Sequence, residues 1–268
     1  MTTSLAVGTA LEAERQAYPI RFPQNELEYD QDEEWCEVYL QGRWHRIRLH
    51  DYAEIYRVEG LYEHLFTSVL RCCSPKMVVG LFAEVLRDWP QAPTELSVLD
   101  LGAGNGMVGE ELRRLGVRSL VGADIIPEAA EAARRDRPGL YDAYVVADMC
   151  RLSAADAQRL SARRPNTLVT VAALGFADIP PLAFATAFNL ISTPGWLAFN
   201  IKETFINGGD QSGFCRLLRD MAEHGIIQTQ AYRRYNHRFS IAGKPLSYVA
   251  VVARKLRDVP RSLVDDVR

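Results

Sequence analysis

A glycine-rich stretch, residues 98–106 with the sequence VLDLGAGNG, is the clearest place in this chain for chemistry. The apolar residues 97–101 predict a buried strand, and the helical spacing of Val108, Leu112 and Leu115 predicts a helix directly after the glycines. Glycine lets the backbone take a positive φ or approach a ligand closely, and the start of a helix offers unpaired N–H groups. The stretch therefore predicts a ligand-binding turn between a strand and a helix.

Two classes of cofactor fit this turn, and Asp100 distinguishes between them. The letters from Gly104 to Gly109 also spell the dinucleotide fingerprint, and Asp124 stands 20 residues beyond Gly104, where a ribose-binding acid is expected. NAD would bring a pyrophosphate close to the Asp100 carboxylate. S-adenosylmethionine has no phosphate and carries an α-amino group and a sulfonium. We therefore expect Asp100 to receive the cationic amine of S-adenosylmethionine.

The motifs of this chain resemble, in order, those of the class I S-adenosylmethionine-dependent methyltransferases over roughly residues 75 to 255. The first motif, an acid followed by alternating glycines, matches residues 100–106. The second and third, acids at the ends of the next two strands, match Asp124 and Asp148, and a Pro-Gly pair before a later strand matches residues 194–195. One match alone is weak, but four in order are specific.

The resemblance implies a role for each matched residue. Asp124 would hold the ribose hydroxyls, Ile125 would pack on the adenine ring, and Asp148 would bond the adenine amino group. The cofactor would be S-adenosyl-L-methionine and the product S-adenosyl-L-homocysteine. The expected cofactor-binding residues are Asp100, Gly102, Ala103, Gly104, Asn105, Gly106, Asp124, Ile125, Asp148 and Met149.

Composition favours a globular enzyme and disfavours several other classes of protein. With 268 residues, 48% of them hydrophobic, the chain can bury a large core. A net charge of −3 gives no broad basic field, which argues against nucleic acid as a partner. No apolar run approaches the ~20 residues that span a bilayer, and the five cysteines show no CxxC spacing. We expect a soluble cytoplasmic protein with no membrane partner.

Strands and helices alternate beyond the glycine turn. We expect strands at 117–124, 143–147, 167–172 and 196–201, and helices at 127–135, 153–162, 180–191 and 212–224. Such alternation predicts a parallel sheet covered on both faces, with a ligand crevice at the carboxyl ends of the strands. Two further strands, 226–232 and 247–253, form a closing hairpin that is typical of methyltransferases by resemblance. The predicted fold is α/β: a Rossmann-like, seven-stranded, mostly parallel sheet with a C-terminal antiparallel hairpin.

The N-terminal part predicts a lid over this sheet. Segments 34–40 and 43–49 alternate in character around Gln41-Gly42, which indicates a hairpin. Residues 50–70 indicate a helix with interleaved aromatic side chains, and residues 76–89 an amphipathic helix. The arm and hairpin could mediate a homodimer. The expected domains are a mobile arm (1–30), a hairpin and helical lid (31–74) and a methyltransferase domain (75–268).

The acceptor side has no fixed motif, because methyl transfer from a sulfonium is an in-line displacement for which the enzyme supplies alignment and excludes water. A base is required when the acceptor is a phenol, an indole or a protonated amine. Candidate residues cluster before the core: His50, Asp51, Tyr52, Tyr56, Glu59, Tyr62 and His64. We select Tyr52, Tyr56 and His64 as catalytic candidates, while the aromatic residues also fit a helix face that packs on the core. We expect His237 in a loop that either roofs the pocket or is exposed.

Residues 172–176, AALGF, follow the fourth core strand and restrict the acceptor. By resemblance, methyltransferases of adenine amines or glutamine carry Asp/Asn-Pro-Pro-Tyr there, and catechol-type enzymes carry metal-binding acids, whereas Asp178 stands alone. We expect no metal and a flat, hydrophobic small-molecule acceptor, an aromatic natural product. Residues 50–66 resemble the start of actinobacterial-type methyltransferases of indole C3 or N1 in tryptophan-derived compounds. The alternatives are an O- or N-methyltransferase of another metabolite, a nicotinamide-dependent oxidoreductase and a non-catalytic methyltransferase-like binding protein.

Overall fold

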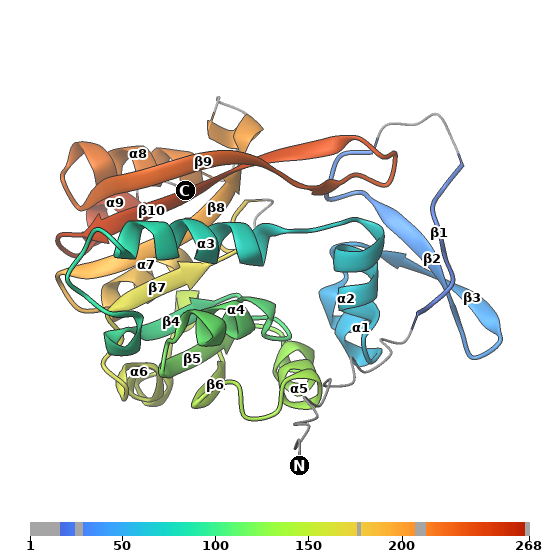
Figure 1. Ribbon diagram of the computed structural model, residues 1–268, viewed down its shortest axis with the longest axis horizontal. Coiled ribbons are helices and arrows are strands. Elements are labelled where there is room, and N and C mark those ends of the chain that lie inside the picture. Colours follow the sequence, from blue (N-terminus) through green and yellow to red (C-terminus); the bar gives the residue numbers. More distant parts are fainter. Residues whose placement is uncertain (1–16, 25–28, 176–177, 207–212, 266–268) are drawn as a thin grey trace, which may run out of the picture.

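The computed structural model describes residues 17–24, 29–175, 178–206 and 213–265 of the chain. A large sheet with helices fills one side of the molecule, and a small sheet stands at the other, with short helices between them (Figure 1). No helix in the described ranges combines the length and the apolar character that a membrane span needs.

The large sheet confirms the predicted seven-stranded fold, with the strand order β6-β5-β4-β7-β8-β10-β9. The first five strands of this order pair in parallel, and β10 is antiparallel to both of its neighbours. The strands are β4 (Ser97–Leu101), β5 (Ser119–Asp124), β6 (Ala143–Val146), β7 (Thr167–Thr170), β8 (Gly195–Lys202), β9 (Ile227–Phe239) and β10 (Pro245–Lys255).

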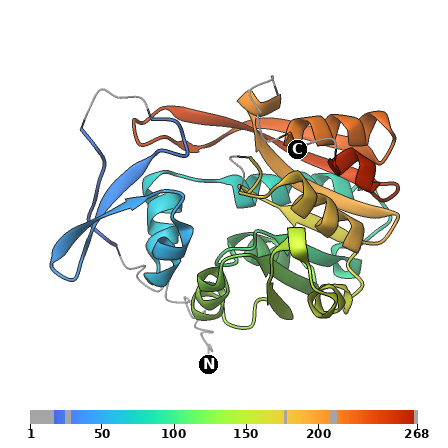
Figure 2. The ribbon, with the colours of Figure 1, turned by 180° about the vertical axis from the view of Figure 1, so that it is seen from behind.

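Helices cover both faces of this sheet, as Figures 1 and 2 show from opposite sides. Phe82 of α3 and Leu112 of α4 are fully buried against one face, and Phe184 of α7 and Leu217 of α8 against the other. The helices are α3 (Ser74–Leu86), α4 (Met107–Leu115), α5 (Pro127–Asp136), α6 (Ala154–Ser161), α7 (Pro181–Leu190), α8 (Phe214–Glu223) and α9 (Arg261–Asp265), with the short 3-10 helices η2 (Pro93–Glu95) and η3 (Met149–Arg151). The predicted helices from 107 to 224 and the parallel strands lie within two residues of these bounds.

The closing hairpin is longer than predicted. β9 continues to Phe239, so the segment from 233 that was expected to be a loop is a strand. The side chains of this part of β9 alternate between the two faces of the sheet, and Tyr235 and His237 point inward and are buried. The alternation is not evident from the sequence because most of these residues are polar. These two side chains are accommodated because hydrogen bonds satisfy them there.

The N-terminal part folds as a small sheet followed by short helices, which together we name the lid (residues 35–69). Its strands β2 (Trp35–Leu40) and β3 (Arg43–Arg48) form the predicted hairpin. β1 (Ile20–Arg21), within the expected N-terminal arm, pairs with β2, whereas residues 1–16 and 25–28 lie outside the described residues.

The single helix expected over residues 50–70 is wrong. The segment forms α1 (Tyr52–Arg57), α2 (Leu61–Glu63) and a π-helix, η1 (His64–Val69). Gly60, with a φ of 69°, separates α1 from α2. Because a left-handed residue cannot continue a right-handed helix, the chain turns there and brings the aromatic side chains of both helices together.

Candidate functional site

A cavity of about 470 Å³ lies at the carboxyl ends of the parallel strands. Residues that follow β4, β5, β6 and β7 form one wall, and Tyr52, Tyr56 and Tyr62 of the lid form another. This is the position that the strand order of an open α/β sheet favours for a ligand.

The glycine turn joins β4 to α4 in the predicted manner. Gly102, Gly104 and Gly106 have positive φ values of 69°, 52° and 92°. A Cβ atom added to Gly104 would lie 2.5 Å from the hydroxyl oxygen of Tyr56, so a side chain there would collide with the lid. Gly102 lines the large cavity, and Ala103, Gly104 and Asn105 line an adjoining one of about 40 Å³.

Asp124 ends β5 and fixes the glycine turn. Its Oδ2 accepts a hydrogen bond from the Gly104 N–H at 2.9 Å, and its Oδ1 accepts one from the Ile126 N–H at 3.0 Å. Burial raises the pKa of the Asp124 carboxyl, while these backbone hydrogen bonds oppose that rise. The next side chain, Ile125, is 60% exposed and lines the cavity.

Asp148 and Met149 form the cavity wall beyond β6, where the sequence predicted them. The Asp148 carboxylate accepts a hydrogen bond from the Cys150 N–H at 2.8 Å and so caps η3. This capping bond holds the side chain at the start of the 3-10 helix. The structure therefore brings Asp124, Ile125, Asp148 and Met149 to one cavity.

Asp100 is placed differently from the expectation. It is fully buried, its Oδ2 accepts a hydrogen bond from the Tyr141 hydroxyl at 2.7 Å, and it does not belong to the residues that line the cavity. Burial raises the pKa of the Asp100 carboxyl to about 7. Its Oδ1 has no hydrogen-bond partner among the described residues. The hydrogen bond of Asp100 thus goes to Tyr141 and not to a group that lines the cavity.

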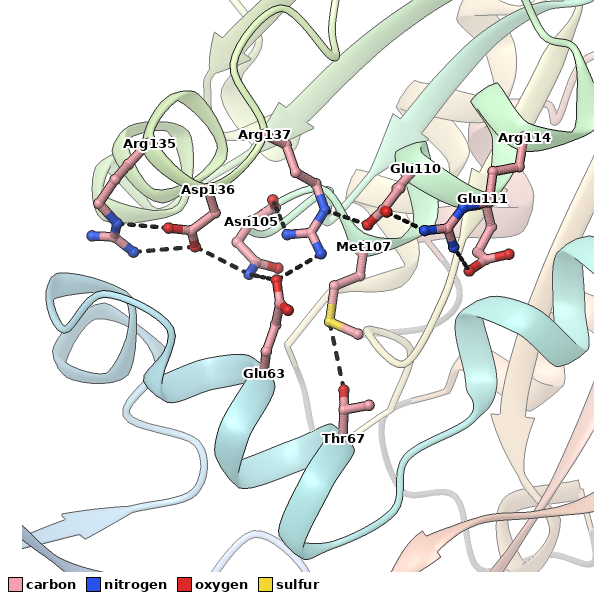
Figure 3. Close-up of polar contacts among 10 residues, drawn as sticks. All are labelled: Glu63, Thr67, Asn105, Met107, Glu110, Glu111, Arg114, Arg135, Asp136 and Arg137. Atoms are coloured by element: carbon pink, nitrogen blue, oxygen red, sulfur yellow. Dashed lines mark hydrogen bonds and ion pairs between the residues drawn. The ribbon is translucent and has the colours of Figure 1, made fainter. Parts of the chain in front are cut away.

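Charged side chains connect the lid to the glycine turn (Figure 3). Arg137 lies 2.6 Å from Glu63 of α2 and 2.8 Å from Glu110 of α4, and it donates a hydrogen bond to the Asn105 carbonyl oxygen at 3.1 Å. The Asn105 amide in turn donates to Asp136 at 3.3 Å. These contacts hold α2 against the turn, so the lid has a defined position over the cavity.

Two of the three catalytic candidates lie at the cavity. Tyr52 and Tyr56 line it, and burial raises the pKa of each phenol well above its ordinary value, so both are neutral hydrogen-bonding groups at neutral pH. His64 is not brought there: its Nε2 lies 2.9 Å from the Tyr18 carbonyl oxygen, and its ring contacts Tyr18. The break in the helix at Gly60 turns His64 toward the N-terminal segment.

The structure adds two residues that we did not select as catalytic candidates. His50, just before α1, and Asp178, in the loop between β7 and α7, both line the cavity, with Nε2 and Oδ2 3.9 Å apart. Burial and Arg238 lower the pKa of His50 to about 4, and burial and Asp32 raise the pKa of Asp178 to about 6. The available sequence signal was the position of Asp178 after a core strand, where site residues of α/β sheets gather.

A buried amide holds the loop after β7. Asn200 of β8 is fully buried, and its Oδ1 accepts a hydrogen bond from the Ala172 N–H at 2.6 Å. Ala172 lines the cavity and has a φ of 56°, which is uncommon for a residue other than glycine. The Asn200 amide also donates to the Tyr235 hydroxyl at 2.7 Å and to Ser74 Oγ at 3.2 Å.

His237 belongs to this buried network. Its Nδ1 lies 2.6 Å from Ser74 Oγ, and the residue is 4% exposed, so both expectations for His237, a roof over the pocket and an exposed surface, are wrong. Burial, reinforced by Arg238, lowers the pKa of His237 to about 3. The ring is therefore a neutral part of the core.

The large cavity has an acidic and otherwise apolar wall. Its titratable side chains, among the residues described, are three aspartates (Asp124, Asp148 and Asp178), the histidine His50, the cysteine Cys150 and the tyrosines of the lid, with no lysine or arginine. Such a wall favours a ligand with positive charge and disfavours a pyrophosphate, which requires cationic or N–H partners.

Comparison with known proteins relates this fold to one enzyme class. Residues 99–161 match the family model described as a methyltransferase domain. A solved S-adenosylmethionine-dependent methyltransferase from Anabaena variabilis is 12% identical, with a TM-score of 0.51 over 78% of this chain and 96% of that one. At this identity the likeness is one of fold.

Two further solved structures have lower TM-scores. Magnesium protoporphyrin IX methyltransferase from Synechocystis, solved with bound S-adenosylmethionine, is 15% identical with a TM-score of 0.47, covering 68% of this chain and 79% of its own. An S-adenosylmethionine-dependent methyltransferase from Mesorhizobium loti is 15% identical with a TM-score of 0.45, covering 66% and 100%. A search of curated proteins found no match.

Proposed function

We propose that this chain is an S-adenosylmethionine-dependent methyltransferase that methylates a small, flat, aromatic acceptor. Residues 99–161 match the family model of a methyltransferase domain. The observation that carries the proposal is the wall of the large cavity, where Asp124, Asp148 and the exposed Ile125 meet with no lysine or arginine among the described residues. A sulfonium nucleoside has a positive charge and no phosphate, so this wall suits it. NAD, the cofactor of the oxidoreductase alternative, would place a pyrophosphate there without a cationic partner.

The proposed cofactor residues each offer a chemical match. Asp124 keeps acceptor capacity beyond its two backbone hydrogen bonds, which suits the ribose hydroxyls. Ile125 offers an exposed apolar surface to the adenine ring, and Asp148 an acceptor to the adenine amino group. The glycine turn at residues 102–106 lets the rest of the cofactor molecule, beyond its ribose and adenine, approach the backbone closely. S-adenosylmethionine, when bound, supplies an electrophilic methyl group.

The lid supplies the aromatic part of the acceptor site. The rings of Tyr56 and Tyr62 have centroids 4.9 Å apart, and those of Tyr62 and Phe66 4.7 Å apart. Ala172 and Ala173, which follow β7, line the same cavity with small apolar side chains. Aromatic and small apolar side chains favour a planar apolar acceptor, and about 470 Å³ is within the ordinary range for small-molecule sites.

Within this class we favour an indole of a tryptophan-derived compound, methylated at C3 or N1. The support is the aromatic segment of α1 and α2, together with neutral Tyr52 and Tyr56, which can orient an acceptor by donating hydrogen bonds. The lid also excludes water from the reacting atoms, which in-line methyl transfer requires. An O- or N-methyltransferase of another aromatic metabolite uses the same arrangement.

The experiment is incubation of the purified full chain with S-adenosylmethionine and a panel of indoles, phenols and amines. We expect a mass gain of one methyl group in an indole or phenol, together with stoichiometric S-adenosylhomocysteine. Transfer only to aliphatic amines contradicts the aromatic acceptor. Binding of S-adenosylhomocysteine without transfer to any acceptor favours the non-catalytic alternative.

A further inference from the structure

A histidine and a carboxylate face each other in a part of the cavity that the cofactor residues do not occupy. Along the sheet, β6 and β5 precede β4 and β7, so Asp148 and Asp124 follow strands on one side of the glycine turn. Asp178 lies in the loop after β7, on the other side. The cofactor assignment therefore uses Asp148 and Asp124 at one end of the cavity wall and leaves Asp178 at the other end unused.

His50 and Asp178 also line a second cavity of about 30 Å³, which adjoins the first. This second cavity contains Gln31, whose amide donates to the Tyr248 hydroxyl at 2.9 Å. Gln31 is 7% exposed, and its Oε1 is buried with no hydrogen-bond partner among the described residues. We name Asp178, His50 and Gln31 the distal subsite.

An acceptor atom that is buried without a donor is costly, by roughly 1–3 kcal/mol. The distal subsite contains such an atom on Gln31 and a carboxylate on Asp178 whose side chain is 32% exposed. A ligand that brings an N–H or O–H group satisfies these acceptors, and a purely hydrocarbon end does not. The subsite therefore selects for a donor on the methyl acceptor.

We propose that Asp178 binds an N–H or O–H group of the aromatic methyl acceptor and takes its proton during transfer. This inference rests on the proposed function, because it needs a methyl acceptor in the cavity. The N–H or O–H bond of the acceptor breaks, and its proton passes to a carboxylate oxygen of Asp178. The electron pair of that bond stays on the acceptor and enriches the atom that takes the methyl group, which is the same heteroatom or, in an indole, C3.

The neighbouring groups leave Asp178 as the base of this subsite. The groups that face it are His50, Asp32, Tyr52, Tyr248 and Arg238. Tyr52 is a neutral phenol, and the lowered pKa of His50 makes that ring a weak base. Arg238 is paired with Glu34. Because the pKa of Asp178 is raised only to about 6, its carboxylate is ionised at neutral pH and still stronger as a base than an ordinary aspartate.

The test uses the full chain saturated with S-adenosylhomocysteine and two pairs of probes, indole with 1-methylindole and phenol with anisole. In each pair the second probe carries a methyl group in place of the donor hydrogen. By calorimetry we expect the wild type to bind indole or phenol at least about tenfold more tightly than its methylated partner. Asp178→Ala should reduce that preference to less than about threefold while its affinity for S-adenosylhomocysteine is unchanged.

Asp220→Ala, which removes a carboxylate from the surface helix α8, is the matched control and should keep the full preference. Asp178→Asn adds a rate measurement: with an acceptor that the wild type methylates, kcat should fall by about 10²- to 10⁴-fold. The inference is overturned if the wild type binds all four probes equally or binds none of them. It is also overturned if Asp178→Ala keeps the full preference for indole or phenol over the methylated partner. Failure to bind S-adenosylhomocysteine instead overturns the proposed function.

Discussion

Glu34, the residue directly before the lid, forms a buried ion pair with Arg238 of the C-terminal hairpin, and removal of this pair gives the largest expected loss of stability. The Glu34 Oε2 lies 2.5 Å from the Arg238 Nη2, and the side chains are 1% and 2% exposed. The other carboxylate oxygen accepts a hydrogen bond from the Ile241 N–H at 2.7 Å. Glu34→Gln leaves the guanidinium buried without a counter-charge.

Loss of one partner from a buried pair costs about 3–5 kcal/mol. The Arg238 guanidinium keeps a second acceptor, the Phe239 carbonyl oxygen at 2.8 Å, and glutamine keeps one oxygen. We therefore expect a loss at the lower end of this range, about 3 kcal/mol in the free energy of unfolding. For a chain of this size, that corresponds to a fall in Tm of about 6–12 °C.

Urea unfolding of Glu34→Gln measures this loss, and Glu37→Gln is the control. Glu37 also lies 2.5 Å from an arginine, Arg21, but these side chains are 29% and 53% exposed. An exposed pair contributes roughly 0–1 kcal/mol, so the control should change little. Equal losses in the two variants would refute the reasoning, because the pairs differ in burial and not in distance.

Three further predictions concern the site. Asp124→Ala should weaken binding of S-adenosylhomocysteine by about 1–3 kcal/mol in calorimetry, since a charged acceptor is lost, and unchanged affinity refutes the ribose role. Asn200→Leu leaves the Ala172 N–H without its acceptor and should lower stability to urea by about 1–3 kcal/mol, whereas Asn200→Asp, which keeps an acceptor oxygen, should lower it less. Burial raises the Asp100 pKa to about 7, so the folded chain keeps a proton that the unfolded chain loses near pH 4. The stability that this proton contributes is lost as pH rises from about 4 to about 7, so Asp100→Asn should gain stability relative to wild type over that range and no further above it; a difference that is constant with pH contradicts this.

The sequence predicted the parts of the fold that local spacing determines. The strand at 97–101 and the helix after the glycine turn have the predicted bounds, because glycines and apolar periodicity act over a few residues. Asp124 and Asp148 were expected from their resemblance to the second and third methyltransferase motifs, and Asp124 also from its spacing of 20 residues beyond Gly104. Each acid stands at the end of a strand, and parallel strands end at one edge of the sheet.

Contacts between distant segments were not predictable in this way. His50 and Asp178 meet because the lid folds over the loop after β7, and neither residue has a local pattern that indicates the other. The inward-facing side chains of β9 could not be recognised from the sequence, because residues such as His237 are polar. The burial of His237 depends on its hydrogen bond with Ser74, which lies far away in the sequence. His64 was misplaced because helical spacing alone does not reveal the turn at Gly60.

The central claim is that the acidic cavity at the glycine turn binds a sulfonium nucleoside and no dinucleotide. Titration calorimetry of the purified chain with S-adenosylhomocysteine, and separately with NAD, tests it most directly. The account predicts saturable binding of one S-adenosylhomocysteine per chain and no heat with NAD. Saturable binding of NAD, or no heat with S-adenosylhomocysteine, would contradict it.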